Sequence, residues 1–269
     1  LHLLVGLSSI AIVRGTLLHY ILYKSFPNAL GECAEYLEIP ETILKQYVDD
    51  SYPDCAVVHK LIHCAMVNLC AWNDTTGIKE HVMESFFAPH PNDTCFLKVT
   101  QNCIQESLLP LSQEAHNSRA YAVFKCYLRH YGDLVHEAKF VPNEHLEFDQ
   151  LIQDCFTLAN IPRDELVQYS RGNIIDGASF PRGFLIGCVR LGYYSLQTGV
   201  NLGTFYAQFG NREILSQQTR ECCERSVREH CDEDHATRLY HIFRNCLVHI
   251  VPTLGLVQKY AKSLVGEVC

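Results

Sequence analysis

The 269-residue chain lacks long hydrophobic runs, an excess of basic residues and the common catalytic motifs. It has 22 Lys and Arg against 30 Asp and Glu, a formal net charge of −8. So acidic a chain has little basic surface to displace counterions from phosphates, which argues against nucleic acid or an anionic membrane as a partner. Beyond the N-terminal segment no stretch is long and apolar enough to cross a bilayer, so we expect no membrane insertion.

Signals for catalysis and for bound metal are equally scarce. The sequence contains no G-x-S-x-G, no H-E-x-x-H, no phosphate loop and no dinucleotide glycine fingerprint, so we expect neither an enzyme nor a cofactor. Zinc-ribbon spacing of cysteines is missing too. His59 and His63 lie four residues apart, and residues 230–235 include two His and three carboxylates. Neither group has a complete ligand set, so we expect no metal site.

Cysteine is abundant, with seven of the 14 residues on each side of residue 150. Such usage predicts a disulfide framework in an oxidising compartment. The N-terminus agrees, because the apolar run from Leu3 to Val13 has the length of a signal-peptide core. We therefore expect residues 1–15 to be a signal peptide and the protein to be secreted. The sequons at Asn73 and Asn92 fit this expectation but are common by chance.

One segment is written twice: CAEYLEIPETILKQY from Cys33 and CFTLANIPRDELVQY from Cys155. Both fit C-x5-I-P-x3-L-x-Q-Y without a gap. Each copy then continues in the same order, through an L-I-x-C segment, a Thr-Gly pair and a final segment that ends at Cys126 or Cys246. These landmarks indicate duplication of a domain of roughly 115 residues.

The periodicity of apolar residues predicts an all-α protein built from two compact, cysteine-linked helical bundles. Pro40 and Pro162 stand where a first helical turn should begin. Helical spacing continues through residues 56–71, 78–87, 95–108, 117–130, 183–196, 212–230 and 235–249. The predicted organisation is a first domain at residues 30–134, a linker at 135–150, a second domain at 151–250 and a C-terminal tail at 251–269.

The repeat and its cysteines resemble the insect odorant-binding proteins, most closely the two-domain atypical class of mosquitoes, over about residues 30–250. This resemblance implies two tandem all-α domains, each with an apolar cavity held open by bridges between the first and third, second and fifth, and fourth and sixth family cysteines. Carried over to this sequence, it implies the pairs Cys33–Cys64, Cys103–Cys126, Cys155–Cys188 and Cys246 with Cys222 or Cys223.

The resemblance also implies that the bridge between the second and fifth cysteines has lost both ends in both copies. Lys60 and Asn117 stand at those positions in the first copy, and Phe184 and about Thr237 in the second. Among the surplus cysteines we expect a Cys55–Cys95 bridge, because each lies in a loop beside a cysteine-bearing helix. Pairing of the remaining ones is left open: Cys70, one of Cys222 and Cys223, Cys231 and Cys269.

Apolar helix faces supply candidate linings for the implied cavities, although such residues more often belong to a solid core. The candidates in the first copy are Leu44, Tyr47, Leu61, Val67, Phe86, Tyr121 and Phe124. The candidates in the second copy are Leu166, Tyr169, Phe184, Leu191, Phe205, Tyr240 and Phe243. The tail from Ile250 is either a cover for the cavity or an ordinary last helix.

Three functions fit the sequence. The first is a secreted carrier of small hydrophobic molecules such as odorants or other semiochemicals, with a chemosensory receptor as a further partner. The second is a scavenger of host amines or lipids, as the resemblance to two-domain salivary proteins of blood-feeding insects implies. The third is a structural secreted protein crosslinked by its surplus cysteines. An apolar ligand distinguishes the first two from the third.

Overall fold

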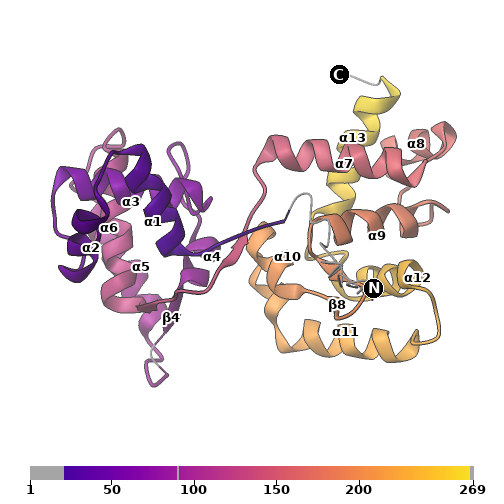
Figure 1. Ribbon diagram of the computed structural model, residues 1–269. Helices are drawn as coiled ribbons and strands as arrows, with labels where there is room; N and C mark the ends of the chain where they lie inside the picture. Colours follow the sequence, from indigo (N-terminus) through magenta and orange to yellow (C-terminus); the bar gives the residue numbers. More distant parts are fainter. Residues whose placement is uncertain (1–20, 90, 267–269) are drawn as a thin grey trace, which may run out of the picture.

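The computed structural model describes residues 21–89 and 91–266, which form two helical domains side by side (Figure 1). The first domain contains α1 (Phe26–Tyr36), α2 (Glu41–Asp49), α3 (Ala56–Asn68), α4 (Glu80–Met83), the 3-10 turn η1 (Glu84–Phe86), α5 (Phe96–Leu108), α6 (His116–Cys126) and the π-turn η2 (Tyr127–Tyr131). The second contains α7 (His145–Ala159), α8 (Arg163–Ser170), α9 (Phe180–Arg190), α10 (Leu202–Phe209), η3 (Arg212–Leu215), α11 (Gln217–Glu229), α12 (His235–Ile242), η4 (Phe243–Leu247) and α13 (Thr253–Val265).

Short antiparallel strand pairs connect these helices. The pairs are β1 (Leu22–Lys24) with β6 (Lys139–Val141), β2 (Trp72–Asn73) with β3 (Gly77–Ile78), β4 (Phe87–Pro89) with β5 (Gly132–Leu134), and β7 (Tyr194–Ser195) with β8 (Gly199–Val200). The all-α prediction is confirmed, because no strand in the described part of the chain exceeds three residues. The described helices include none that is long and apolar enough to span a membrane.

The two domains repeat one order of elements. Helices α1 to α6 correspond to α7 to α12, and a π-turn follows the last helix of each set. The hairpin β2–β3 corresponds to β7–β8, and its turn needs a glycine, since Gly77 and Gly199 have φ of 82° and 80°. Pro40 and Pro162 are the N-caps of α2 and α8, immediately before the first turn. The second copy alone continues into a further helix, α13, where the first continues into β5.

The boundaries between the domains differ from those predicted. Helix α7 begins at His145, inside the expected linker, and Phe148 belongs to the core of the second domain. The first domain begins before residue 30, because the buried Phe26 and Ala29 belong to its core. The expected signal peptide at residues 1–15 lies outside the described residues.

Three of the expected disulfides are present: Cys33–Cys64, Cys103–Cys126 and Cys222–Cys246. Each joins two helical elements of one domain, for example α1 to α3. The structure selects Cys222, with Cys223 a buried thiol. The expected Cys55–Cys95 bridge is wrong. Both are exposed thiols that precede different helices, α3 and α5, and these helices are joined through their separate contacts with α6.

The positions of the lost bridge are occupied differently in the two copies. In the first, α3 packs on α6, and His59 Nδ1 lies 3.2 Å from the hydroxyl of Ser118. Lys60 follows His59 and Asn117 precedes Ser118 in the sequence, so this polar contact lies beside the two positions. In the second, the ring of Phe184 lies 4.6 Å from that of Phe243, which joins α9 to the π-turn η4.

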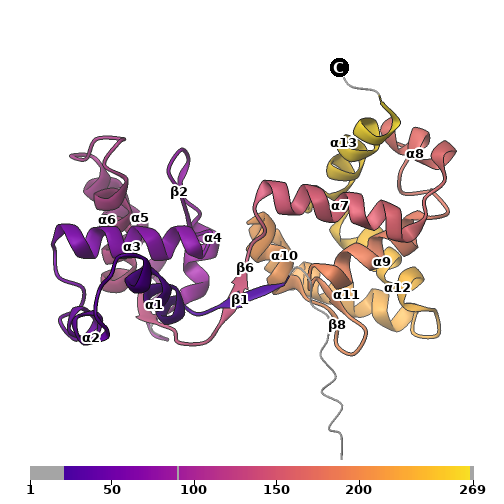
Figure 2. The same ribbon diagram turned by 45° about the horizontal axis from the view of Figure 1, so that its top comes forward.

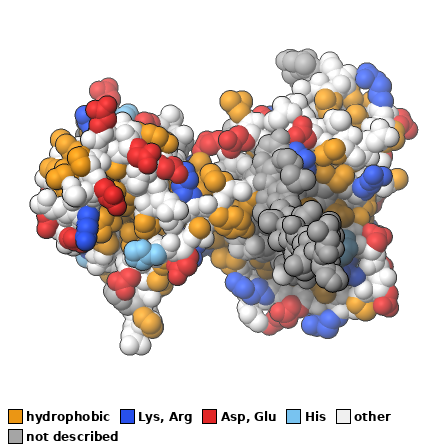
Figure 3. All heavy atoms as spheres, in the orientation of Figure 1, with side chains coloured by type: hydrophobic (Ala, Val, Ile, Leu, Met, Phe, Trp, Pro, Cys, Tyr) orange, Lys and Arg blue, Asp and Glu red, His pale blue; other side chains and the backbone are white. Residues whose placement is uncertain are grey.

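Strands from both ends of the first domain meet between the domains, where β1 runs beside β6 (Figure 2). Beside them, Lys79 forms an ion pair with Glu144 (3.1 Å), and the Asn143 backbone N–H donates to Gln208 (2.9 Å). Over both domains, acidic and basic side chains are interspersed on the face seen in Figure 3.

Glu84 is the most buried charged group of the domain interface. Its side chain is 9% exposed and receives hydrogen bonds from Arg212 and from the hydroxyl of Tyr206 (3.2 Å). Burial raises the pKa of Glu84, although the Arg212 guanidinium opposes that rise. Because Arg212 is itself 56% exposed, water stabilises its charge even without Glu84. The contact is therefore asymmetric: the carboxylate needs its partner more than the guanidinium does.

Replacing each partner in turn tests this asymmetry. Arg212→Ala should lower the free energy of unfolding by about 1–3 kcal/mol, because it leaves a buried carboxylate without its cation. Glu84→Gln should cost less than about 1 kcal/mol, since the amide keeps the shape and Arg212 can be solvated. Denaturant unfolding of both variants measures the difference. Equal losses, or a larger loss for Glu84→Gln, would show that the pair is not asymmetric.

Candidate functional site

An apolar cavity lies in the second domain between α7, α9 and α13, which Figure 2 shows packed together with α8. Its open volume is about 60 Å³, which is below the 300–1,000 Å³ usual for small-molecule sites. The cavity is therefore narrow, and its walls must move apart to admit a molecule much larger than water. Its lining residues are Phe148, Ile152, Cys155, Phe156, Ile161, Tyr169, Phe180, Gly183, Phe184, Gly187, Cys188, Leu191, Tyr193, Phe209, Thr253, Leu256 and Val257.

Helix α13 completes the wall of this cavity. It packs on α8 and α7, and presents Thr253, Leu256 and Val257, which have the i, i+3, i+4 spacing of one helix face. The C-terminal tail is thus a last helix that also closes the cavity, so both sequence interpretations hold in part. The first domain has no counterpart of α13 among its described elements.

The seven candidates of the second copy divide into two layers. Tyr169, Phe184 and Leu191 line the cavity, and their contact with a ligand stays a prediction. The other four do not line it: Leu166, Phe205, Tyr240 and Phe243. They pack behind the wall; the ring of Phe205, for example, stacks 4.4 Å from that of Tyr193. Phe205 and Phe243 belong to the core, and the part-buried Leu166 and Tyr240 pack against it.

Candidates of the first copy do not line this cavity. Leu61, Phe86 and Phe124 are fully buried in a solid core, where Phe124 stacks on Phe26 at 5.3 Å. The part-buried Leu44 and Tyr47 pack against the same core.

Two other candidates of the first copy have clear places of their own. The hydroxyl of Tyr121 donates to the carbonyl of Tyr52 (2.9 Å). Val67 is 43% exposed, so its assignment to a cavity is wrong. It lies on the exposed side of α3, away from the buried Ile62.

Sequence reasoning missed the residues that α7 and α13 contribute. Phe148, Ile152 and Phe156 are spaced by four residues, as expected for one face of a helix that begins in the expected linker. This spacing can be read from the sequence. The approach of α13 to α8 depends on tertiary packing and has no comparable local signal.

Cys155 and Cys188 face each other in the cavity wall as buried thiols, so the expected bridge between them is not formed in the structure. The Sγ of Cys155 lies 3.5 Å from the point where a Cβ on Gly187 would stand. Burial raises the pKa of Cys155 to about 12 and that of Cys188 well above its usual value. Exchange into a disulfide requires a thiolate, which this apolar wall disfavours.

The cavity contains one polar group without a partner. Tyr193 lines the wall and is 3% exposed, and its hydroxyl has no hydrogen-bond partner among the described residues. Burial raises the pKa of this hydroxyl well above its usual value, so it is a neutral donor. An unpaired buried hydroxyl is costly, and a ligand oxygen would satisfy it.

A carboxylate in contact with the cavity wall is already bound by the protein. Glu165 Oε1 accepts from the hydroxyl of Tyr169 (2.7 Å) and from the backbone N–H of Ser179 (2.8 Å). The loop between them passes so close that a Cβ on Gly177 would lie 2.5 Å from the same oxygen. Glu165 therefore fixes the loop beside the cavity and offers little to a cationic amine.

The two histidines considered as metal ligands on α3 bind different partners. His59 Nε2 lies 2.7 Å from Asp54, whereas His63 Nε2 lies 2.8 Å from Asp74. Asp74 also accepts from the indole N–H of Trp72 (2.9 Å). These contacts tie α3 to neighbouring loops and bring no common ligand set together.

The first domain is similar to a known protein family. Residues 22–130 match the PBP/GOBP family. General odorant-binding protein 69 of Anopheles gambiae is 27% identical over 153 residues, which cover 53% of this chain and 66% of that protein. The chain thus spans slightly less than two thirds of this relative. No solved structure matches the chain.

Glu165 predicts an acid-sensitive contribution to stability. Burial alone would raise its pKa, but the hydrogen bonds from Ser179 and Tyr169 together lower it below the usual 4.5. Its contribution should be present at neutral pH and be lost as the pH falls through the lowered value. Glu165→Gln should therefore lower the free energy of unfolding by about 1 kcal/mol at pH 7 and by less in acid.

The measurement is denaturant unfolding of both proteins at several pH values, with the exposed Glu106→Gln as the control. A difference between Glu165→Gln and the parent that stays constant down to pH 3 would contradict the assignment.

Proposed function

We propose that the chain is a secreted carrier of small hydrophobic molecules that uses the cavity of its second domain. The match of its first domain to the PBP/GOBP family and its similarity to an odorant-binding protein support this proposal. The apolar cavity is the observation that carries the proposal. Its walls are helix faces and aromatic rings, the lining that takes up apolar guests. Secretion is supported by the disulfides within both domains. A receptor as a further partner stays a prediction.

The first domain serves as a scaffold in this proposal. Its core is filled by rings in contact, including Phe26 on Phe124 and Tyr52 on Phe124 at 4.9 Å. Since a well-packed core accepts no further volume without strain, we expect ligand to enter the second domain alone. One ligand should therefore bind per chain.

The unpaired hydroxyl of Tyr193 favours a ligand that carries an oxygen able to accept a hydrogen bond. A molecule that fills the narrow cavity and gives one oxygen to this hydroxyl satisfies both the apolar wall and the donor. Aliphatic alcohols, aldehydes, ketones and esters have this chemistry. Cationic amines do not, because the nearby Glu165 carboxylate already has two donors.

Titration with the fluorophore N-phenyl-1-naphthylamine tests the position of the site. Leu256→Trp places a larger ring in the cavity wall and should weaken binding by about tenfold or more. Leu264→Trp is the matched control, because Leu264 lies on the same helix but is 43% exposed and does not line the cavity. We expect one site per chain in the parent and the control. Two sites, or equal affinity of the two variants, would contradict the proposal.

Tyr193→Phe tests the class of ligand. Competition against the same fluorophore should show that decanal binds about five- to tenfold more weakly, because its oxygen loses a hydrogen bond. Decane should bind as before, since it never used the hydroxyl. Stability should be unchanged or higher, because the substitution removes an unsatisfied buried group. An equal loss for decanal and decane would mean that Tyr193 only shapes the cavity.

A further inference from the structure

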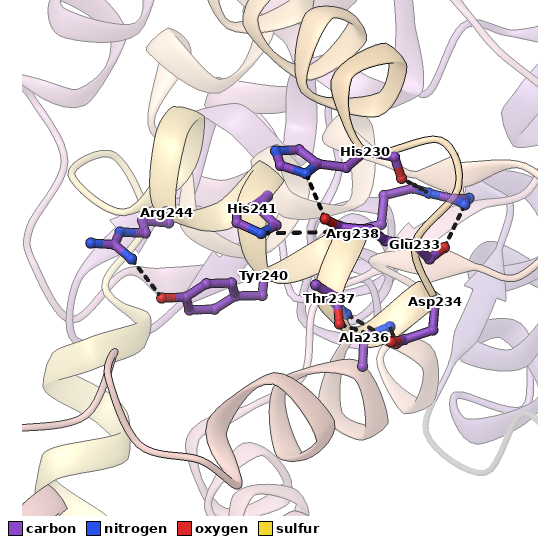
Figure 4. Close-up of polar contacts among 9 residues, drawn as sticks. All are labelled: His230, Glu233, Asp234, Ala236, Thr237, Arg238, Tyr240, His241 and Arg244. Atoms are coloured by element: carbon purple, nitrogen blue, oxygen red, sulfur yellow. Dashed lines mark hydrogen bonds and ion pairs between the residues drawn. The ribbon is translucent and has the colours of Figure 1, made fainter.

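A second cluster of functional groups lies where α11 ends and α12 begins. His230 is the C-cap of α11, Glu233 follows in the loop, and His241 lies two turns into α12. His230 Nδ1 is 3.2 Å from Glu233 Oε1, and His241 Nε2 is 3.7 Å from Glu233 Oε2. One ligand atom from each residue lies within 4.8 Å of the others (Figure 4).

We propose that His230, Glu233 and His241 form a binding site for a divalent transition-metal ion of the zinc type. The sequence did not predict this site, because residues 230–235 alone offer an incomplete ligand set. His241 completes it from α12, eight residues beyond Glu233. His235 does not take part, since its Nδ1 lies 2.8 Å from the hydroxyl of Tyr194.

The distances suit a small ion. Two ligand atoms that each lie about 2.1 Å from a tetrahedral zinc ion are about 3.4 Å apart. The two His–Glu separations in the structure, 3.2 and 3.7 Å, lie on either side of that value. Two imidazoles and a carboxylate leave one position open for water. Imidazole nitrogens favour zinc, copper or nickel over calcium and magnesium.

The protein holds the loop that carries the ligands. Arg238 donates to three loop carbonyls, those of His230 (3.2 Å), Cys231 (2.7 Å) and Glu233 (2.8 Å). Figure 4 shows the Arg238 side chain reaching back along this loop. Three bonds to one guanidinium fix the backbone on either side of the site, so rearrangement on binding an ion is confined to the ligand side chains.

Two further constraints fix the helices themselves. Asp234 caps α12 by accepting from the backbone N–H groups of Ala236 (2.8 Å) and Thr237 (3.1 Å). The disulfide Cys222–Cys246 joins α11 to the turn that follows α12. The ligands are 20–39% exposed, so an ion can reach them from solvent while the protein shields part of each.

The arrangement of the two histidine rings indicates how the site must change when a metal ion binds. They stack in parallel, with centroids 3.7 Å apart and an interplanar angle of 3°. A metal ion lies close to the plane of each imidazole that binds it, and one ion cannot lie in two parallel planes. Binding must therefore turn the rings out of their stack, with His230 bound through Nδ1 and His241 through Nε2.

Isothermal titration of the untagged, EDTA-treated full chain with zinc chloride tests the site. We expect one saturable site, weakened more than about tenfold by His230→Gln or His241→Gln. His249→Gln is the matched control, because His249 is exposed and belongs to no described cluster. The control should bind zinc as the parent does. Absence of a saturable site, or equal binding by all three variants, would overturn the proposal.

A second measurement on the parent protein avoids any effect of the substitutions on folding. Nitrogen-15 NMR of the histidine rings should show zinc-induced shifts at Nδ1 of His230 and Nε2 of His241, together with loss of the ring-current shifts of the stacked pair. Shifts confined to other histidines would also overturn the proposal, because they would place the ion elsewhere.

Discussion

Covalent cross-links between helices are the constraint on which both domains depend. In each copy a disulfide anchors the end of the chain segment that forms the last helix and its π-turn: Cys103–Cys126 joins α5 to the end of α6, and Cys222–Cys246 joins α11 to the π-turn η4. These links oppose separation of the helices and limit the unfolded chain, but they do not decide whether the space between helices is filled. That is decided by side chains, and the two copies differ there.

The two domains differ in the use of one helical frame. The first has an aromatic core in which Phe124 contacts several rings. The second has an additional helix, α13, and an apolar cavity beneath it. Near the positions where the resemblance implies a lost bridge, His59 contacts Ser118 in the first copy and Phe184 contacts Phe243 in the second. Phe184 also lines the cavity.

Much of this architecture could be predicted from the sequence. The repeated motifs predicted two domains, and the periodicity of apolar residues predicted most of the helices. Both are local properties of the chain. The bridges that formed were implied by the resemblance. The sequence could not show which three of the seven second-copy candidates line the cavity. Phe184 lines it and Phe243 does not, and this difference depends on which helices pack against each residue. For the same reason the sequence did not indicate that His241 joins His230 and Glu233, because their proximity depends on how α12 packs beside α11.

The central claim is that ligand occupies the second domain while the first remains a filled scaffold. Backbone chemical-shift mapping of the full chain with and without a saturating aliphatic aldehyde tests it most directly. The account predicts shifts that cluster in α7, α9 and the first two turns of α13, with the core around Phe26 and Phe124 unchanged. Shifts of similar size in the first-domain core would contradict it, because they would show that this core opens to ligand as well.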